Sequence, residues 1–162
     1  MKVSFSPEEI LKLEQAGKAR SIEKADGHFT VQVDQTRESA DIHIEGIWGE
    51  FAVSKVLGSE MDWTVYVGKG DGGILDQTYK GKSLQIKATR YKKGGLLYNS
   101  PHKLKADIHI LAIVDIENNE VEVAGWVTRE QFHERKSRKL TRVHHQNRVV
   151  DQKDLNPIED LR

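Results

Sequence analysis

The chain of 162 residues contains no cysteine. Disulfide bonds and zinc sites built from thiolates are therefore excluded. The sequence also lacks any apolar run near the roughly 18 residues that a membrane span needs, so we predict no transmembrane segment. Residues 1–9 lack the apolar stretch of a secretory signal, and we expect an intracellular, cytoplasmic protein.

Neither sign of charge is in excess, because 25 lysines and arginines balance 25 aspartates and glutamates. This balance argues against a protein that coats DNA nonspecifically, since such proteins are usually strongly basic. It does not exclude a nucleic-acid enzyme whose positive charge is concentrated locally. The length and the 37% hydrophobic content predict one domain, spanning 1–162, with a substantial core.

Capping residues and apolar patterns outline the secondary structure. Ser6 and Pro7 predict the start of a helix, and a second helix is expected from about 40 to 57, with Gly58 as its C-cap. A nearly continuous apolar run at 108–114 predicts a buried central strand. The remaining expectations are strands at 28–33, 63–67 and 121–127, an exposed loop at 90–105, and a helix capped by Thr128 and Gln131.

The order of these elements predicts an α/β fold with a central mixed β-sheet flanked by helices. We expect the core at about 40–136, followed by a basic C-terminal tail at about 137–162. No internal repeat or linker divides the chain.

A β-hairpin is predicted after residue 75, and its register has a chemical consequence. Tyr79-Lys80-Gly81-Lys82 is a turn signal, and a loop of two or four residues places Asp76 directly opposite Gln85. A three-residue loop would shift this register. Residues opposite each other have Cβ atoms about 4.5–5.5 Å apart. Because Gln85 and Lys87 alternate onto the same face, a carboxylate, an amide and an ammonium group gather there.

The second predicted helix adds a carboxylate from a distant part of the chain. Gly46, Glu50, Val53 and Leu57 share one helical face by their spacing. Glu50 therefore lies on or beside an apolar face that could pack closely on the sheet. A carboxylate there needs a partner, and a metal ion or Lys87 would provide one.

This combination of a helix glutamate, a strand aspartate and Gln-x-Lys on the next strand resembles the PD-(D/E)xK nuclease superfamily, in its Gln-x-Lys variant. The resemblance covers roughly 45–126 and implies a restriction-endonuclease-like, three-layer αβα core. It implies that Asp76, the Gln85 side-chain oxygen, the Ile86 carbonyl and Glu50 bind a metal. Lys87 would orient the attacking water or stabilise phosphate charge. Leu75 replaces the proline of the family name.

The implied activity is hydrolysis of DNA phosphodiester bonds with Mg²⁺ or Mn²⁺, and no nucleotide cofactor. A homodimer could cut both strands symmetrically. The substrate could be a Holliday junction, or the enzyme could be a restriction, repair, viral or mobile-element nuclease. Two alternatives stay open: a DNA-binding module whose metal site is weakened because Gln85 replaces an acid, and an assembly protein. Asp71 competes with Asp76 for the role of first acid.

Two basic segments are candidate DNA contacts. The first directly follows the motif strand and comprises Arg90, Tyr91, Lys92 and Lys93. The second lies in the predicted tail and includes Arg138 and Lys139. Lysine and arginine in such positions favour phosphate contacts. The pair His144-His145 has no ligand spacing that supports a zinc site.

Overall fold

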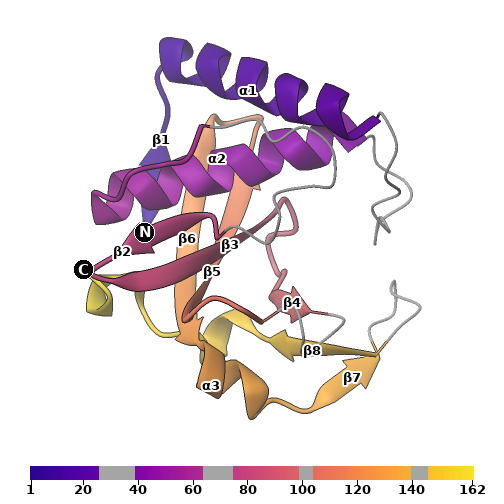
Figure 1. Cartoon of the computed structure of the whole chain (residues 1–162), viewed down its shortest axis with the longest axis vertical. Helices are drawn as coiled ribbons and strands as arrows, with labels where there is room; N and C mark the ends of the chain where they lie inside the picture. The colour runs from indigo at the N-terminus through magenta and orange to yellow at the C-terminus, as the bar shows by residue number, and fades with distance from the viewer. Residues whose placement is uncertain (26–38, 64–74, 99–103, 140–145) are drawn as a thin grey trace.

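A computed structural model describes residues 1–25, 39–63, 75–98, 104–139 and 146–162 (Figure 1). The elements, in chain order, are β1 (Lys2–Ser4), α1 (Pro7–Ala25), α2 (Ser39–Leu57), β2 (Gln77–Tyr79), β3 (Lys82–Thr89), β4 (Leu96–Tyr98), β5 (Ile108–Asp115), β6 (Glu120–Thr128), α3 (Arg129–His133), β7 (Ser137–Lys139), β8 (Gln146–Val150) and the 3₁₀ turns η2 (Gln152–Asp154) and η3 (Ile158–Asp160).

The main sheet has five strands in the order β1-β6-β5-β3-β2. Strands β3 and β5 are parallel, while the other neighbouring pairs are antiparallel, so the sheet is mixed. Strand β5 lies in its middle, and seven of its eight residues are buried, which explains its nearly continuous apolar sequence. The predicted α/β class, the mixed sheet and the central strand at 108–114 are confirmed.

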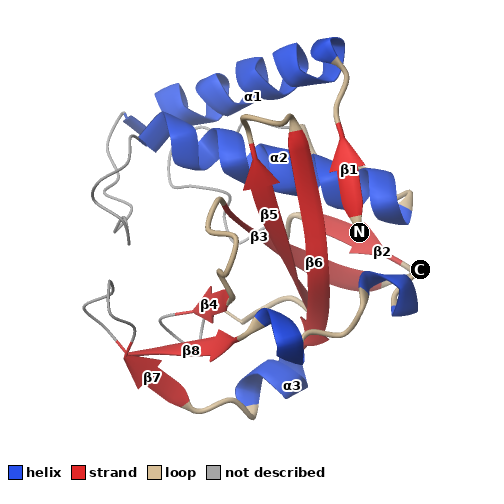
Figure 2. Ribbon diagram, turned by 180° about the vertical axis from the view of Figure 1, so that it is seen from behind, coloured by secondary structure: helices blue, strands red, loops and turns tan. Residues whose placement is uncertain are grey.

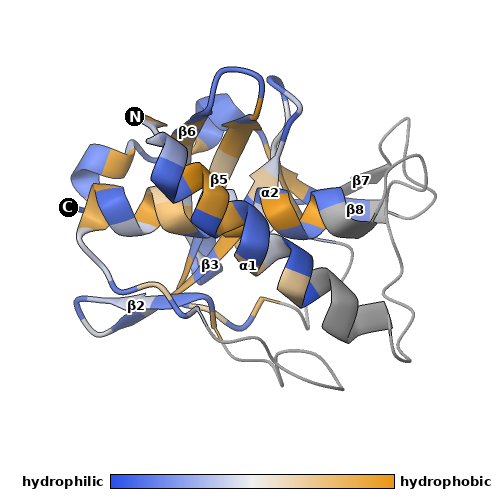
Figure 3. Cartoon of the chain, turned by 90° about the horizontal axis from the view of Figure 1, so that it is seen from above, coloured by the Kyte–Doolittle hydropathy of each residue, from blue (hydrophilic) through white to orange (hydrophobic). Residues whose placement is uncertain are grey.

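Helix α2 covers one face of this sheet, and α1 packs on the outer side of α2 (Figure 1). Figure 3 shows apolar residues concentrated along α2 and along the strands beneath it. The predicted capping of α1 is confirmed, since the Ser6 hydroxyl accepts a hydrogen bond from the Glu9 amide at 3.2 Å. Helix α2 ends at Leu57, and the next residue, Gly58, has a φ of 69°, the left-handed conformation that favours glycine after a helix end.

Glycine allows α2 to approach the sheet closely, although not at the position that helical spacing suggested. A Cβ atom added at Gly49 would lie 3.0 Å from the Cβ of Ala88 and 3.2 Å from that of Ala112. At Gly46, an added Cβ would meet nothing within 4 Å. The close contact therefore occurs one residue before Glu50, which fixes the distance between Glu50 and the sheet.

The opposite face of the main sheet is covered by α3 and by a second sheet, in the order β4-β8-β7 (Figure 2). A second apolar cluster fills the space between them, with Leu96, Leu111, Phe132 and Val150 fully or almost fully buried. In the parts of the chain that are described, this layer is a small sheet with one short helix. It differs from the helical third layer expected of an αβα core.

Both ends of the chain take part in the fold beyond the expected core at 40–136. Phe5, Leu13 and Ile158 are buried in the main apolar cluster. Trp126 and Asn156 exchange two backbone hydrogen bonds of 3.0 and 2.8 Å. The segment expected to be a basic tail thus contains β7, β8 and two 3₁₀ turns.

Other expectations have mixed outcomes. The loop expected at 90–105 contains the short strand β4, which is too short to give an alternating signal. The capping box of Thr128 and Gln131 at the start of α3 is confirmed. Trp63 belongs to no strand, and the other residues of the strands expected at 28–33 and 63–67 lie outside the described residues. No described helix has both the length and the apolar composition needed to cross a membrane.

Candidate active site

The hairpin of β2 and β3 has the predicted register. Tyr79 pairs with Lys82, and Gln77 pairs with Leu84. Lys80 and Gly81 form the two-residue loop with φ angles of 47° and 73°, as a type I′ turn requires. This turn matches the twist of the two strands, so the residue before β2 lies at a fixed level along β3.

That residue is Asp76, which is tied to β3 by two hydrogen bonds. Its backbone amide donates to the Leu84 carbonyl at 3.1 Å, and its carboxylate accepts from the Ile86 amide at 2.6 Å. These bonds lie on either side of Gln85, so Asp76 is beside Gln85 as predicted. The N–H and C=O groups of one strand residue point to the same side of the strand. Because the Ile86 amide faces Asp76, the Ile86 carbonyl also faces that side.

The side chains of β3 alternate between the two faces of the sheet. Leu84 and Ile86 belong to the main core under α2. Gln85 and Lys87 therefore point to the other face, toward the small sheet, and the Lys87 Nζ lies 5.3 Å from the ring centroid of Tyr98 on β4. The predicted sharing of one face by Gln85 and Lys87 is confirmed.

Glu50 lies on α2, and its carboxylate is held by Arg20 of α1. One guanidinium nitrogen of Arg20 lies 2.9 and 3.1 Å from the two carboxylate oxygens, and another donates to the Asp62 carbonyl at 2.8 Å. The Glu50 side chain is 13% exposed. The pKa of Glu50 is raised to about 7, mainly by burial and then by the negative charge of Asp76, while Arg20 opposes both effects.

The negative charge of Asp76 acts on the pKa of Glu50, whereas Gln85 and Lys87 point to the face of the sheet opposite α2. The helix glutamate and the Gln-x-Lys pair therefore lie on different faces of the sheet. Gln77 joins β2 to α2, because its side-chain amide donates to the Glu50 backbone carbonyl and accepts from the Ser59 hydroxyl at 2.6 Å. Gln77 itself is only 4% exposed. Helix α2 is thus bonded directly to the strand that follows Asp76.

A buried aromatic group lies beneath Lys87. The Tyr98 hydroxyl is 2.9 Å from Nδ1 of His109, which pairs with Gln85 in the register of β3 and β5. The pKa of His109 is lowered to about 4, mainly by burial and then by the positive charge of Lys87, so its imidazole is neutral at pH 7. Burial also raises the pKa of Tyr98, which keeps its hydroxyl protonated.

The predicted metal ligands are all oxygens: the carboxylates of Asp76 and Glu50, the Gln85 amide and the Ile86 carbonyl. Such donors suit Mg²⁺ or Mn²⁺. The negative charge of Asp76 raises the pKa of Glu50, and a divalent cation bound between such carboxylates would relieve this unfavourable interaction. Across the described ranges, no group of three or more histidine, aspartate or glutamate side chains is arranged to hold a metal.

The first basic segment divides into two parts. Arg90 forms ion pairs with the buried side chain of Glu45, at 2.6 Å, and with Asp41 at 3.7 Å, so it links the end of β3 to α2. Tyr91, Lys92 and Lys93 are exposed. Arg138 and Lys139 belong to β7, but their side chains are outside the described part of the structure, as are Asp71 and the pair His144-His145.

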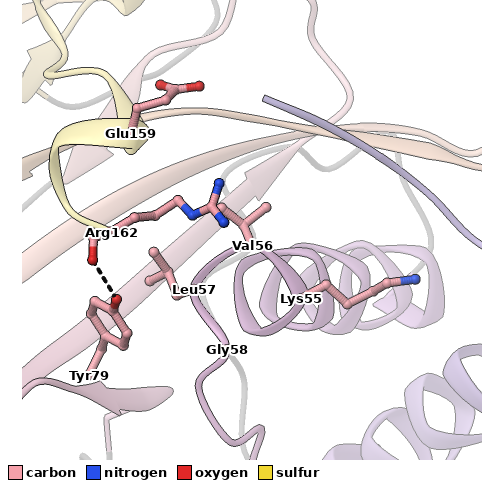
Figure 4. A pocket seen from close by; sticks show the side chains of 7 residues that line it. All are labelled: Lys55, Val56, Leu57, Gly58, Tyr79, Glu159 and Arg162. Atoms are coloured by element: carbon pink, nitrogen blue, oxygen red, sulfur yellow. Dashed lines mark hydrogen bonds between the residues drawn. The ribbon is translucent and has the colours of Figure 1, made fainter.

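A surface hollow of about 590 Å³ lies at the other end of α2 (Figure 4). Its lining includes Lys55, Gly58, Glu159 and Arg162, and the Tyr79 hydroxyl there donates to the Arg162 carbonyl at 3.0 Å. None of the predicted site residues lines it, and its charges are of both signs. It therefore adds nothing to the candidate site.

Sequence reasoning does not find Arg20, Gln77, Tyr98 or His109. Arg20 and Tyr98 reach the site through tertiary packing, for which a single sequence carries no signal. Gln77 is an ordinary polar residue at a strand start. His109 offers a signal, because it is the polar side chain within the apolar run at 108–114.

A scan against models of known protein families finds no match to this chain, and a search of curated proteins finds no similar protein. The resemblance to the PD-(D/E)xK superfamily therefore stays a prediction.

Proposed function

We propose that this protein is a metal-dependent DNA endonuclease of the PD-(D/E)xK type, with a restriction-endonuclease-like core formed by α2, the hairpin and β5. One observation carries the proposal: Asp76 is bonded to the Ile86 amide and lies beside Gln85, while its charge acts on Glu50. Lys87 follows Gln85 on the same face of β3. These are the four side chains of the motif: Glu50 lies on α2, Asp76 directly precedes β2, and Gln85 and Lys87 lie on β3.

In the proposed reaction, a water oxygen bonds to phosphorus and releases a proton to solvent, one phosphorus–oxygen ester bond breaks, and solvent protonates the leaving oxygen. A divalent cation, when bound, would polarise the phosphate and lower the pKa of the attacking water. Asp76, Gln85, Glu50 and the Ile86 carbonyl would hold it. Lys87 would orient the water and stabilise the charge that develops on the phosphate.

Four-way junctions are one candidate substrate, and a homodimer would place two such sites for symmetric cleavage. Restriction, repair, viral and mobile-element roles are the others. Comparing cleavage of a four-way junction, a duplex and a single strand by the same preparation separates these roles.

The decisive experiment incubates purified protein with supercoiled plasmid in Mg²⁺, in Mn²⁺ and in EDTA. We expect nicked and linear products with either metal and none with EDTA. Persistent cleavage in EDTA would contradict a metal-dependent mechanism. Absence of cleavage on every substrate and metal would contradict the nuclease proposal.

The second candidate function is a DNA-binding module that has lost effective metal binding. It is favoured by two observations: Gln85 contributes no charge, and Arg20 already neutralises Glu50. Calorimetric titration with Mn²⁺ distinguishes the two, because a working nuclease binds the ion at this site and the module does not.

If the exposed loop of Tyr91, Lys92 and Lys93 binds DNA, the affinity should depend on salt in a way that these lysines determine. We expect Lys92→Gln/Lys93→Gln to reduce the slope of log affinity against log salt by about 1 to 2, because each phosphate contact contributes about 0.9. Fluorescence anisotropy with a labelled duplex in Ca²⁺, across a salt series, measures this slope.

Lys105→Gln is the control, because Lys105 is also an exposed lysine but lies outside this loop, just before β5. It should leave the slope unchanged. Arg90→Gln should instead lower stability, because it removes the ion pair with the buried Glu45 carboxylate. An unchanged slope in the double variant would show that this loop does not contact DNA.

A further inference from the structure

Lys87 is long and flexible, yet the structure places it over a rigid aromatic surface. Its Nζ lies 5.3 Å from the Tyr98 ring centroid, within the range in which an ammonium group is attracted to the face of an aromatic ring. Tyr98 is 4% exposed, so its ring is shielded from competing water. Desolvation strengthens this kind of attraction.

The Tyr98 ring is itself held by two neighbouring rings. Its hydroxyl is bonded to Nδ1 of His109 at 2.9 Å, and the two rings meet edge to face at 5.1 Å. Phe132 of α3 meets the Tyr98 ring at 5.2 Å and the His109 ring at 5.7 Å. Strands β4 and β5 and helix α3 therefore fix this ring before any ligand binds.

We propose that the face of the Tyr98 ring positions the ammonium group of Lys87 beside Asp76 and Gln85, so that Tyr98 is a positioning residue of the proposed nuclease site. This inference rests on the proposed function. Contact with a fixed ring already restricts the Lys87 side chain. Less conformational entropy then remains to be lost on reaching the transition state. The small sheet then has a role in the site, because it carries Tyr98.

The partners of the ring are suited to this role. His109 is a neutral imidazole at pH 7, because burial lowers its pKa, so it places no positive charge next to Lys87. The protonated Tyr98 hydroxyl adds no negative charge that would draw the ammonium group away from the site. Lys87 therefore contacts an uncharged group, through the face of the Tyr98 ring.

The test combines NMR with steady-state kinetics. Lys87→Arg identifies the Lys87 ε-methylene signals, and we expect these signals to show an upfield ring-current shift in the unaltered protein. Tyr98→Phe should keep the shift and lower kcat by less than about threefold. Tyr98→Leu should abolish the shift and lower kcat about tenfold, with KM for DNA unchanged.

Leu96→Ala is the matched control, because Leu96 is fully buried on the same strand and in the same apolar cluster. It should destabilise the protein but keep the Lys87 shift and the kcat. Unshifted Lys87 signals in the unaltered protein would overturn the proposal, as would equal losses of kcat in the two Tyr98 variants. If Tyr98→Leu does not fold, the unaltered protein and Tyr98→Phe still decide the question.

The NMR signature also separates this inference from the proposed function. Shifted Lys87 signals in a protein that cleaves no DNA would contradict the nuclease and support the contact between Lys87 and Tyr98. Unshifted signals in an active nuclease would overturn the positioning role alone.

Discussion

Asp76→Asn and Lys87→Met should each lower the rate of metal-dependent DNA cleavage by about two to three orders of magnitude. In the proposed mechanism, both side chains act on charge at the reacting phosphate. No neighbouring side chain on β3 supplies a second carboxylate or ammonium group in their place. Asparagine keeps the size of Asp76 and can still accept a hydrogen bond from the Ile86 amide. The loss should therefore reflect the missing charge rather than a disrupted hairpin.

A plasmid-nicking time course in Mg²⁺ and Mn²⁺ measures these rates, with circular dichroism and thermal unfolding as checks on folding. Lys82→Met is the matched control, because Lys82 is an exposed lysine on the same strand. It should retain full activity. Cleavage that survives in both Asp76→Asn and Lys87→Met would contradict the assignment of the site.

Gln85→Glu in the same assay addresses the missing acid. If Gln85 binds the metal through its side-chain oxygen, adding a charge should lower the Mn²⁺ concentration needed for half-maximal activity. The comparison uses the unaltered protein at equal concentration.

The hairpin can be predicted because its determinants are local. The turn residues Lys80 and Gly81 set the loop length, and the alternation of β3 sets the faces, so the position of Asp76 follows by counting. The first turns of α1 and α3 are predictable for the same reason, since their caps lie three residues away from the groups that they bond.

The features that escape prediction depend on contacts between distant segments. Arg20 reaches Glu50 across 30 residues, and no pattern in α1 marks that arginine as different from its neighbours. Strand β4 has three residues and is recognised by its pairing with β8, about 50 residues later. The sequence alone therefore indicates neither the small sheet nor the role of Tyr98, and the segment after residue 136 resembles a tail because its strands are short and polar.

These long-range contacts change the interpretation of the site. The sequence suggests a metal ion or Lys87 as the partner of Glu50, and the structure provides Arg20 instead. Even with this partner, burial and the charge of Asp76 keep the pKa of Glu50 at about 7. The charged form of such a carboxylate is unfavourable and lowers the stability of the folded state. A stability cost of this kind is expected at residues that serve function.

Glu50→Gln should therefore make the protein more stable at pH 8, by about 1 to 3 kcal/mol. The folded state raises the pKa of Glu50 from 4.5 to about 7, so between these values it binds more protons than the unfolded state. The contribution of Glu50 to stability consequently falls as pH rises from about 4.5 to 7, and it is constant above that. Glutamine is neutral throughout and removes this dependence.

Urea unfolding of both proteins at pH 5 and pH 8 measures the effect. The difference between the two proteins is the informative quantity, because His109 has the opposite dependence: its pKa falls from 6.5 to about 4 on folding, so its contribution rises with pH up to about 6.5. His109 is present in both proteins and cancels. Equal stability differences at pH 5 and pH 8 would contradict a raised pKa for Glu50.

Two further comparisons connect this pH dependence to the proposed metal site. Asp76→Asn should reduce the dependence partly, because the Asp76 charge is the second cause of the raised pKa of Glu50. Added Mn²⁺ should stabilise the unaltered protein more at pH 8 than at pH 5, since the ion must displace a proton from Glu50 at the lower pH. In Glu50→Gln this difference between the two pH values should shrink, because glutamine has no proton to displace. A carboxylate that is costly without metal and favourable with it would explain why Glu50 is buried although the charge of Asp76 disfavours its ionised form.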